Sequence, residues 1–175
     1  MNRVVGDALL CRRSDERWSV TCIELPKGMA VLERNGPMTR VIVADSSPTA
    51  ACQDTPDAYA AAVCTPDGEL ALVVHNSPPA IVVGPSECTT RPAEGAGRDC
   101  LCLDPGQRLL LLSAAAFESL PRVLADSLTS APDDLARRNP ENLLLEIFSE
   151  VGRGAGVAID RLPADAPSPG PTSAP

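Results

Sequence analysis

The sequence predicts an α+β fold built on a mainly antiparallel β-sheet with few helices. As far as residue 112, short apolar runs alternate with turns rich in Pro, Gly and Asp, which is typical of strands. Between residues 114 and 151, helix-forming residues replace that alternation, and a last apolar run predicts a final strand. Many strands followed by a helical segment and one more strand indicate the α+β class.

Each short apolar run bounded by turn residues is expected to be a strand. The clearest hairpin joins residues 58–65 to residues 69–75 through Pro66-Asp67-Gly68, whose residue types suit a tight turn. Further hairpins are expected around the polar turn at residues 14–17 and around residues 104–107. The expected strands cover residues 4–12, 18–25, 38–44, 58–65, 69–75, 80–83, 98–103, 108–112 and 157–162.

Two helical segments are expected after residue 113. Residues 114–125 carry helix formers, with Pro121 marking a break or a new first turn. In the second segment Asn139 is expected as the N-cap and Pro140 at the first helical position. Its apolar stripe is formed by Leu143, Leu144, Ile147 and Val151. Between the two segments, Asp133-Asp134 stands beside Arg137-Arg138 and is expected to be a solvated helix start.

The chain of 175 residues is expected to form a single domain, over residues 1–162. Residues 163–175 contain Pro, Ala, Ser, Gly and Asp without apolar periodicity, and they predict a disordered tail. Residues 46–56 are expected to form a loop rich in small residues.

Charge and hydropathy argue against two classes of partner. The net charge is −8, and a field of that sign repels the phosphates of nucleic acids. No run approaches the roughly 20 apolar residues that a membrane span needs. Asp7 lies where a secretory signal would be apolar, so the protein is expected in the cytoplasm.

The seven cysteines indicate reduced thiols and no disulfide framework. Their number is odd, and none forms a Cys-x-x-Cys pair. Cys100 and Cys102 point to one face of the expected strand, and with Cys88 and His75 they offer donors of the types that zinc binds. The spacing matches no established zinc module, so structural thiols are the preferred interpretation.

Three stretches of the chain resemble the metal-dependent PPM-type serine/threonine phosphatases (protein phosphatase 2C-like) of the SpoIIE-like branch. Residues 75–80 (His-Asn-Ser-Pro-Pro-Ala) resemble a Gly-His-Pro-Pro-type turn that follows a hairpin in that family. Residues 104–115 resemble its Pro-Gly-Asp-x-Leu-Leu-Leu strand and Thr-Asp-Gly end, and Val5-Gly6-Asp7 resembles its Gly-Gly-Asp. Residues 17–28 resemble the second strand and the following Gly-rich loop. The resemblance covers most of residues 4–162 and implies a β-sandwich.

The resemblance also implies a chemistry whose acids are incomplete here. The family uses two divalent metals, held by aspartates, to activate a water for attack on a phosphoester. Asp7 would hold the first acid position, and Glu24 would stand for the bridging aspartate, one methylene longer. Ala114 replaces the aspartate of Thr-Asp-Gly, and Ala155-Gly156 replace the terminal acids. We therefore expect no catalytic residue and no cofactor, and at most a residual Mn²⁺ or Mg²⁺ site at Asp7 and Glu24.

The chain is also shorter than the family pattern. Between residues 28 and 59 the family has two long helices packed on the sheet, whereas this segment carries three prolines. The resemblance therefore implies a truncated sandwich with one open sheet face, which a protein partner or a second copy would cover.

The expected function is that of a pseudophosphatase, a protein-binding regulator in bacterial signalling. Its partner would be a phosphoprotein, a kinase, an anti-sigma factor or a scaffold. The alternative is a weak or atypical metal-dependent serine/threonine phosphatase that uses Asp7 and Glu24. His75 lacks a nucleophile and an orienting acid in the sequence pattern, so a structural role is expected for it.

Overall fold

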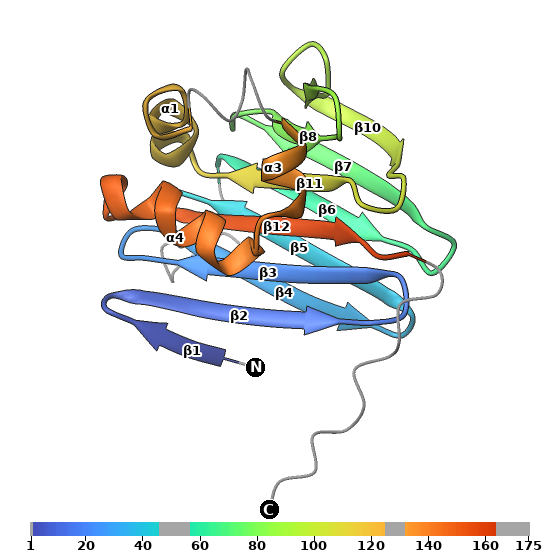
Figure 1. Ribbon diagram of the computed structural model, residues 1–175, viewed down its shortest axis with the longest axis horizontal. Coiled ribbons are helices and arrows are strands. Elements are labelled where there is room, and N and C mark those ends of the chain that lie inside the picture. Colours follow the sequence, from blue (N-terminus) through green and yellow to red (C-terminus); the bar gives the residue numbers. More distant parts are fainter. Residues whose placement is uncertain (1, 46–56, 125–131, 164–175) are drawn as a thin grey trace, which may run out of the picture.

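The computed structural model describes residues 2–45, 57–124 and 132–163, which form two antiparallel β-sheets packed face to face (Figure 1). Sheet A has the spatial order β1 (Asn2–Val5), β2 (Ala8–Ser14), β3 (Trp18–Glu24), β12 (Ala155–Arg161), β11 (Arg108–Leu112), β8 (Ala80–Val83) and β9 (Cys88–Arg91). Sheet B has the order β10 (Gly97–Cys102), β7 (Glu69–His75), β6 (Tyr59–Cys64), β5 (Met38–Ala44) and β4 (Met29–Asn35). The predicted α+β class is confirmed.

Helices cover the outer face of sheet A. The described helices are α1 (Ala114–Val123), α3 (Pro132–Arg137) and α4 (Pro140–Val151). In Figure 1, α3 and α4 lie in front of the strands and contact sheet A, and α1 packs on α4. None of the helices in the described ranges is long and apolar enough to cross a membrane.

Sheet A therefore lies between two apolar cores. On β3, Trp18, Val20 and Cys22 face sheet B and join the core between the sheets. Ile23 of the same strand joins the second core, beneath the helices, together with Leu144 and Phe148. Because both faces are covered, β3 is buried at almost every position. β7 instead alternates between buried and exposed positions, because only its inner face meets a core.

Several predicted elements are confirmed by the structure. The strands over 38–44, 58–65, 69–75 and 80–83 are present as β5, β6, β7 and β8. Asn139 caps α4, and its side-chain oxygen accepts hydrogen bonds from the backbone N–H groups of Glu141 and Asn142 at 2.9 and 3.1 Å. Asp133 and Asp134 lie in the first turn of α3 and pair with Arg137 and Arg138.

Other predictions were wrong. The strand expected over 4–12 is a hairpin, since Gly6 adopts a φ of 60° that reverses the chain between β1 and β2. The hairpin expected around residues 104–107 is instead a connection between sheets, because β10 pairs with β7 and β11 pairs with β8 and β12. α1 continues through Pro121 without a break there. β4 and β9 were not predicted.

Two predictions concern residues outside the described ranges. The loop over 46–56 lies there entirely, as do residues 164–175 of the expected tail. The division into a domain of residues 1–162 and a tail of residues 163–175 therefore stays a prediction.

Candidate functional site at one end of the sandwich

A charged cavity lies at the end of the sandwich where β3, β5 and β11 finish. Its volume is about 310 Å³. Its walls come from the β3–β4 loop, the end of β5, the start of α1 and the α4–β12 loop. The lining residues are Lys27, Asp45, Ala114, Ala115, Glu118, Arg153 and Gly154.

Two loops far apart in sequence form one wall of this cavity. The backbone N–H of Leu25 donates to the carbonyl of Gly154 at 2.9 Å, and the N–H of Gly154 donates to the carbonyl of Pro26 at 3.2 Å. A Cβ on Gly28 would lie 2.0 Å from the carbonyl carbon of Gly154, so the close contact requires glycine. This close contact between the β3–β4 and α4–β12 loops, called the interlock below, places Lys27 and Arg153 in the lining of the same cavity. Lys27 adopts a φ of 65°.

Asp45 holds the start of α1. Its carboxylate accepts a hydrogen bond from the backbone N–H of Ala114, the first residue of the helix, at 3.0 Å. The N-cap residue, Ser113, makes no side-chain capping bond. A negative charge is favourable at this position because the N-terminus of a helix carries a partial positive charge. The role of Asp45 is therefore accounted for by α1.

Ser113 is placed as a structural hydroxyl. It is 1% exposed, and its Oγ accepts a hydrogen bond from the N–H of Ala155 at 3.2 Å. A Cβ on Gly154 would lie 2.3 Å from that Oγ. The hydroxyl is thus enclosed by the α4–β12 loop and does not belong to the cavity lining.

The predicted metal ligands lie outside the cavity lining. Asp7 is exposed in the turn between β1 and β2. Glu24 ends β3, and its Oε2 accepts a hydrogen bond from the N–H of Ala30 at 2.9 Å. Within the described ranges, no three or more His, Cys, Asp or Glu residues group together so that they could hold a metal ion. A residual metal site at Asp7 and Glu24 stays a prediction.

The positions where the resemblance places further acids hold small residues in this fold. Ala114 lies on the cavity wall. Ala155 is fully buried in the core between the sheets. A Cβ on Gly156 would lie 2.7 Å from the ring of Phe148 and 3.0 Å from Leu112. A carboxylate at residue 156 would therefore require Phe148 to move, and residues 114 and 156 supply no acid ligand here.

The predicted histidine and cysteines lie on different parts of the fold. His75 ends β7, where its ring centroid is 5.7 Å from that of Tyr59 and its Nε2 is 3.3 Å from the side-chain nitrogen of Asn76. Cys100 and Cys102 lie on β10 in sheet B, whereas Cys88 lies on β9 in sheet A.

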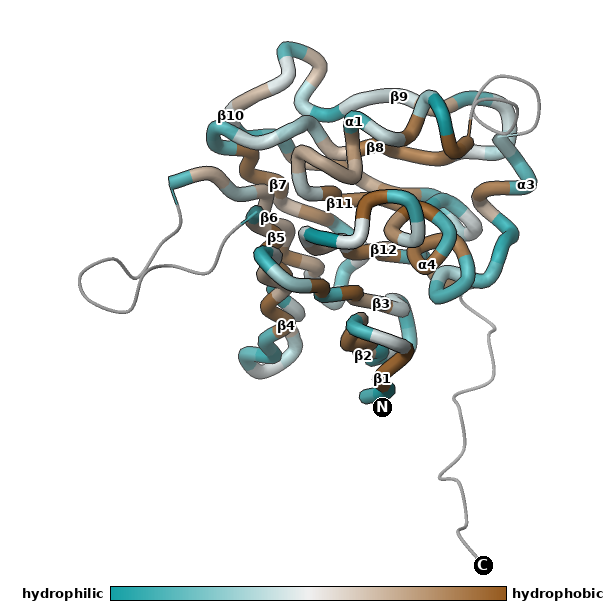
Figure 2. The backbone as a smooth tube through the Cα atoms, turned by 90° about the vertical axis from the view of Figure 1, so that its left-hand side faces the viewer, coloured by the Kyte–Doolittle hydropathy of each residue, from teal (hydrophilic) through white to brown (hydrophobic). Residues whose placement is uncertain are grey.

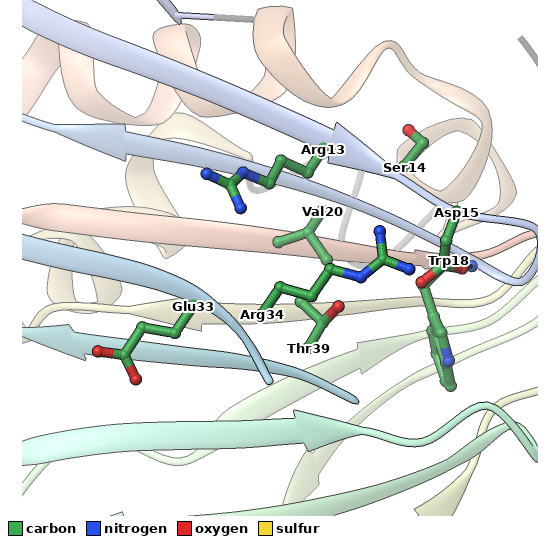
Figure 3. A pocket seen from close by; sticks show the side chains of 8 residues that line it. All are labelled: Arg13, Ser14, Asp15, Trp18, Val20, Glu33, Arg34 and Thr39. Atoms are coloured by element: carbon green, nitrogen blue, oxygen red, sulfur yellow. Dashed lines mark hydrogen bonds between the residues drawn. The ribbon is translucent and has the colours of Figure 1, made fainter. Parts of the chain in front are cut away.

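A second cavity, of about 170 Å³, lies between the sheets at the opposite end of β3 (Figure 3). Arg13, Arg34 and Asp15 line it. Asp15 is engaged by the turn between β2 and β3, since it accepts hydrogen bonds from the N–H groups of Arg17 and Trp18, both at 2.8 Å. These contacts explain the fold of the turn.

Sequence reasoning missed Lys27, Asp45 and Arg153. The sequence hints at the two loops only through the Lys-Gly and Arg-Gly dipeptides at 27–28 and 153–154. Glycine is often found where one backbone segment approaches another closely. Whether the loops that carry these dipeptides lie side by side depends on which loops meet at the end of the sandwich. No local pattern contains that information.

Comparisons with known proteins identify the fold. No protein-family model matches the chain, and no curated protein sequence matches it. Solved structures do match, and the chain has the fold of PPM-type phosphatase domains. Their sequence identity to this chain is about 10%, so the likeness concerns the fold alone.

Three solved structures illustrate the match. The PP2C phosphatase domain and regulatory fragment of SpoIIE from Bacillus subtilis matches with a TM-score of 0.58 and 10% identity, covering 90% of this chain and 63% of that one. RsbX in complex with magnesium matches with a TM-score of 0.58 and 10% identity, covering 88% and 100%. The RsbU and RsbW domains of a Mycobacterium tuberculosis protein match with a TM-score of 0.57 and 10% identity, covering 86% and 61%. The chain thus spans less than two thirds of the first and third of these structures.

Proposed function

We propose that this chain is a pseudophosphatase: a PPM-fold protein that binds a protein partner in bacterial signalling and does not catalyse phosphoester hydrolysis. The observation that supports this most strongly is the packing of Gly156 against Phe148, which leaves no space for a carboxylate at residue 156. Ala114 supplies none at the start of α1. A two-metal mechanism needs several anionic oxygen ligands around hard cations. We therefore expect no cofactor.

The proposed partner belongs to a signalling pathway. Phosphatase-fold neighbours include a two-domain structure in which an RsbU domain is joined to an RsbW domain. By analogy, we infer a phosphoprotein, a kinase, an anti-sigma factor or a scaffold as the partner of this chain, and a cytoplasmic location. The analogy rests on the fold alone, and affinity capture with the purified chain is the experiment that identifies the partner.

A second candidate function is a weak phosphatase that uses Asp7 and Glu24 with Mn²⁺ or Mg²⁺. It is favoured by the fact that RsbX, a similar fold, was solved with magnesium. It is disfavoured by the hydrogen bond between Glu24 and Ala30, which occupies one carboxylate oxygen.

Turnover of a phosphoserine peptide with Mn²⁺ separates these two functions. We expect no metal-dependent phosphate release from the wild-type chain. Release that disappears in both Asp7→Ala and Glu24→Ala would establish the weak phosphatase and reject the pseudophosphatase. Arg13→Gln, at the opposite end of the sandwich, is the matched control and should leave any such activity unchanged.

A further inference from the structure

The outer face of sheet B has no helix on it in the described part of the chain. The described helices pack against sheet A or against each other. In Figure 2 they lie to the right of β5, β6 and β7, whose apolar residues appear in brown. Among the described residues, helices therefore cover the centre of sheet A on its outer side, whereas none covers the outer side of sheet B.

An apolar row crosses the centre of this outer face. The register places Val31 of β4 beside Ile42 of β5, Ile42 beside Ala61 of β6, and Ala61 beside Val73 of β7. These side chains point away from the core between the sheets, which is formed by their neighbours along each strand. Val31, Ile42 and Val73 are partly exposed, so apolar surface remains accessible to solvent along this row.

The charges at the rim of the face are balanced and lie on opposite sides. Glu33 and Arg40 lie toward the β4 edge, 3.8 Å apart and more than half exposed. Glu69 and Arg98 lie toward the β10 edge, both exposed. The outward positions of the five strands carry two negative and two positive residues, in a chain whose net charge is −8. The face can therefore approach a copy of itself without the repulsion that the whole molecule exerts.

We propose that two copies of this chain associate face to face through the outer surface of sheet B. A two-fold axis parallel to β6 places β4 of one copy over β10 of the other, since these strands form the two edges of the sheet. By the strand register, Glu33 then lies over Cys100, one outward position along β10 from Arg98, and symmetry repeats this arrangement. The apolar rows meet at the centre. This association is independent of whether the chain is catalytic.

The size of the face sets the expected affinity. Five strands about 4.8 Å apart, each about six residues long with a rise of about 3.3 Å per residue, make a face of roughly 24 by 20 Å. Two such faces bury roughly 1,000 Å², near the lower limit for a specific interface. We therefore expect a reversible dimer with a dissociation constant on the order of micromolar.

Sedimentation velocity from about 1 µM to about 200 µM tests the dimer across that range. The wild type should shift from monomer to dimer. Ile42→Asp should raise the dissociation constant at least about tenfold, because it places a charge in the apolar centre. Val4→Asp is the matched control, since Val4 is 69% exposed on β1 of sheet A, and it should dimerise like the wild type. A wild-type chain that stays monomeric throughout would overturn the proposal.

Charge exchange tests the orientation of the two copies without disturbing the core. Arg98→Glu alone should weaken the dimer, and Glu33→Arg combined with Arg98→Glu should restore it. Circular dichroism of each variant verifies the fold. A dimer unaffected by both Ile42→Asp and Arg98→Glu would place the contact on another surface.

Native thiols give an independent measurement. Cys100 and Cys102 are exposed and point outward on β10, whereas Cys88 lies on β9 of sheet A. Maleimide labelling of Cys100 and Cys102 should slow as the dimer forms, while the rate at Cys88 stays constant. Unchanged rates at Cys100 and Cys102 in a sample that sediments as a dimer would contradict the proposed face.

Discussion

The carboxylate of Glu24 accepts a hydrogen bond from the backbone N–H of Ala30 at 2.9 Å, across the loop that joins the two sheets. Glu24 ends β3 in sheet A, and Ala30 is the second residue of β4 in sheet B. The residue that resembles a bridging metal ligand thus has a structural partner in this fold. Its carboxylate stabilises the loop that carries Lys27 and Gly28.

We predict that Glu24→Ala lowers the free energy of unfolding by about 1–3 kcal/mol, because the N–H of Ala30 loses a charged acceptor. Glu24→Gln retains an acceptor oxygen and should cost less. Urea unfolding followed by circular dichroism measures both. Equal stability of the wild type and Glu24→Ala would show that the hydrogen bond contributes nothing.

Gly28 is predicted to be intolerant of any side chain. In Gly28→Ala the new Cβ would lie 2.0 Å from backbone atoms of Gly154, so two loops must separate. We expect a loss of more than about 2 kcal/mol in unfolding free energy. Gly84→Ala is the control, because its nearest neighbours would lie at 3.4 and 3.5 Å. Similar stability of the two variants would contradict the interlock.

Arg108 is predicted to hold α3 against sheet A, because it pairs with Asp160 of β12 and also contacts Leu135 of α3. Arg108 is 3% exposed and also donates to the carbonyl of Leu135 at 2.7 Å. Burial raises the pKa of Asp160, although Arg108 acts in the opposite direction. Arg108→Met should therefore cost about 2–3 kcal/mol, since it leaves the partly buried carboxylate of Asp160 without Arg108.

The double variant Arg108→Met/Asp160→Leu distinguishes a charge effect from lost packing. It should recover most of the stability, because no buried charge remains. Thermal or urea unfolding of the two variants provides the comparison. A double variant as unstable as Arg108→Met alone would assign the loss to packing.

Buried thiols predict a loss of stability at alkaline pH. Burial, and to a lesser degree the neighbouring Cys11, raises the pKa of Cys22 to about 12, and burial likewise raises that of Cys64 to about 12. An unfolded thiol titrates near its ordinary value, about 8.5. The folded state therefore holds its protons longer, and this contribution is complete below about pH 8.5 and is lost as the pH rises toward 12.

Urea midpoints at neutral pH and at pH about 10 measure this contribution. The decrease in stability should be smaller in Cys22→Val, which cannot ionise. A decrease of the same size in wild type and variant would assign the alkaline effect to other groups.

Much of the fold could be predicted because it depends on local patterns. The α4 cap at Asn139, the hairpin at Pro66-Asp67-Gly68 and the apolar strand 108–112 each carry their own signal. Strand pairing carries no such local signal. The turn at 104–107 looks like a hairpin turn, yet β10 and β11 enter different sheets, because that choice depends on which neighbours bury each strand.

The candidate site was less predictable than the fold. Asp7 and Glu24 came from the resemblance, whereas the cavity is lined by Lys27, Asp45 and Arg153 from separate loops. The hydrogen bonds between Leu25, Pro26 and Gly154 bring two of these loops together, across more than a hundred residues of sequence. Such a contact appears only when both sheets are in place.

The absence of catalysis is tested most directly by calorimetric titration of Mn²⁺ and Mg²⁺ into the purified chain, with phosphopeptide turnover measured alongside. The pseudophosphatase predicts no stoichiometric binding up to millimolar metal and no turnover. Stoichiometric binding with turnover, both lost in Asp7→Ala, would contradict it and show that the remaining acids form a working metal site.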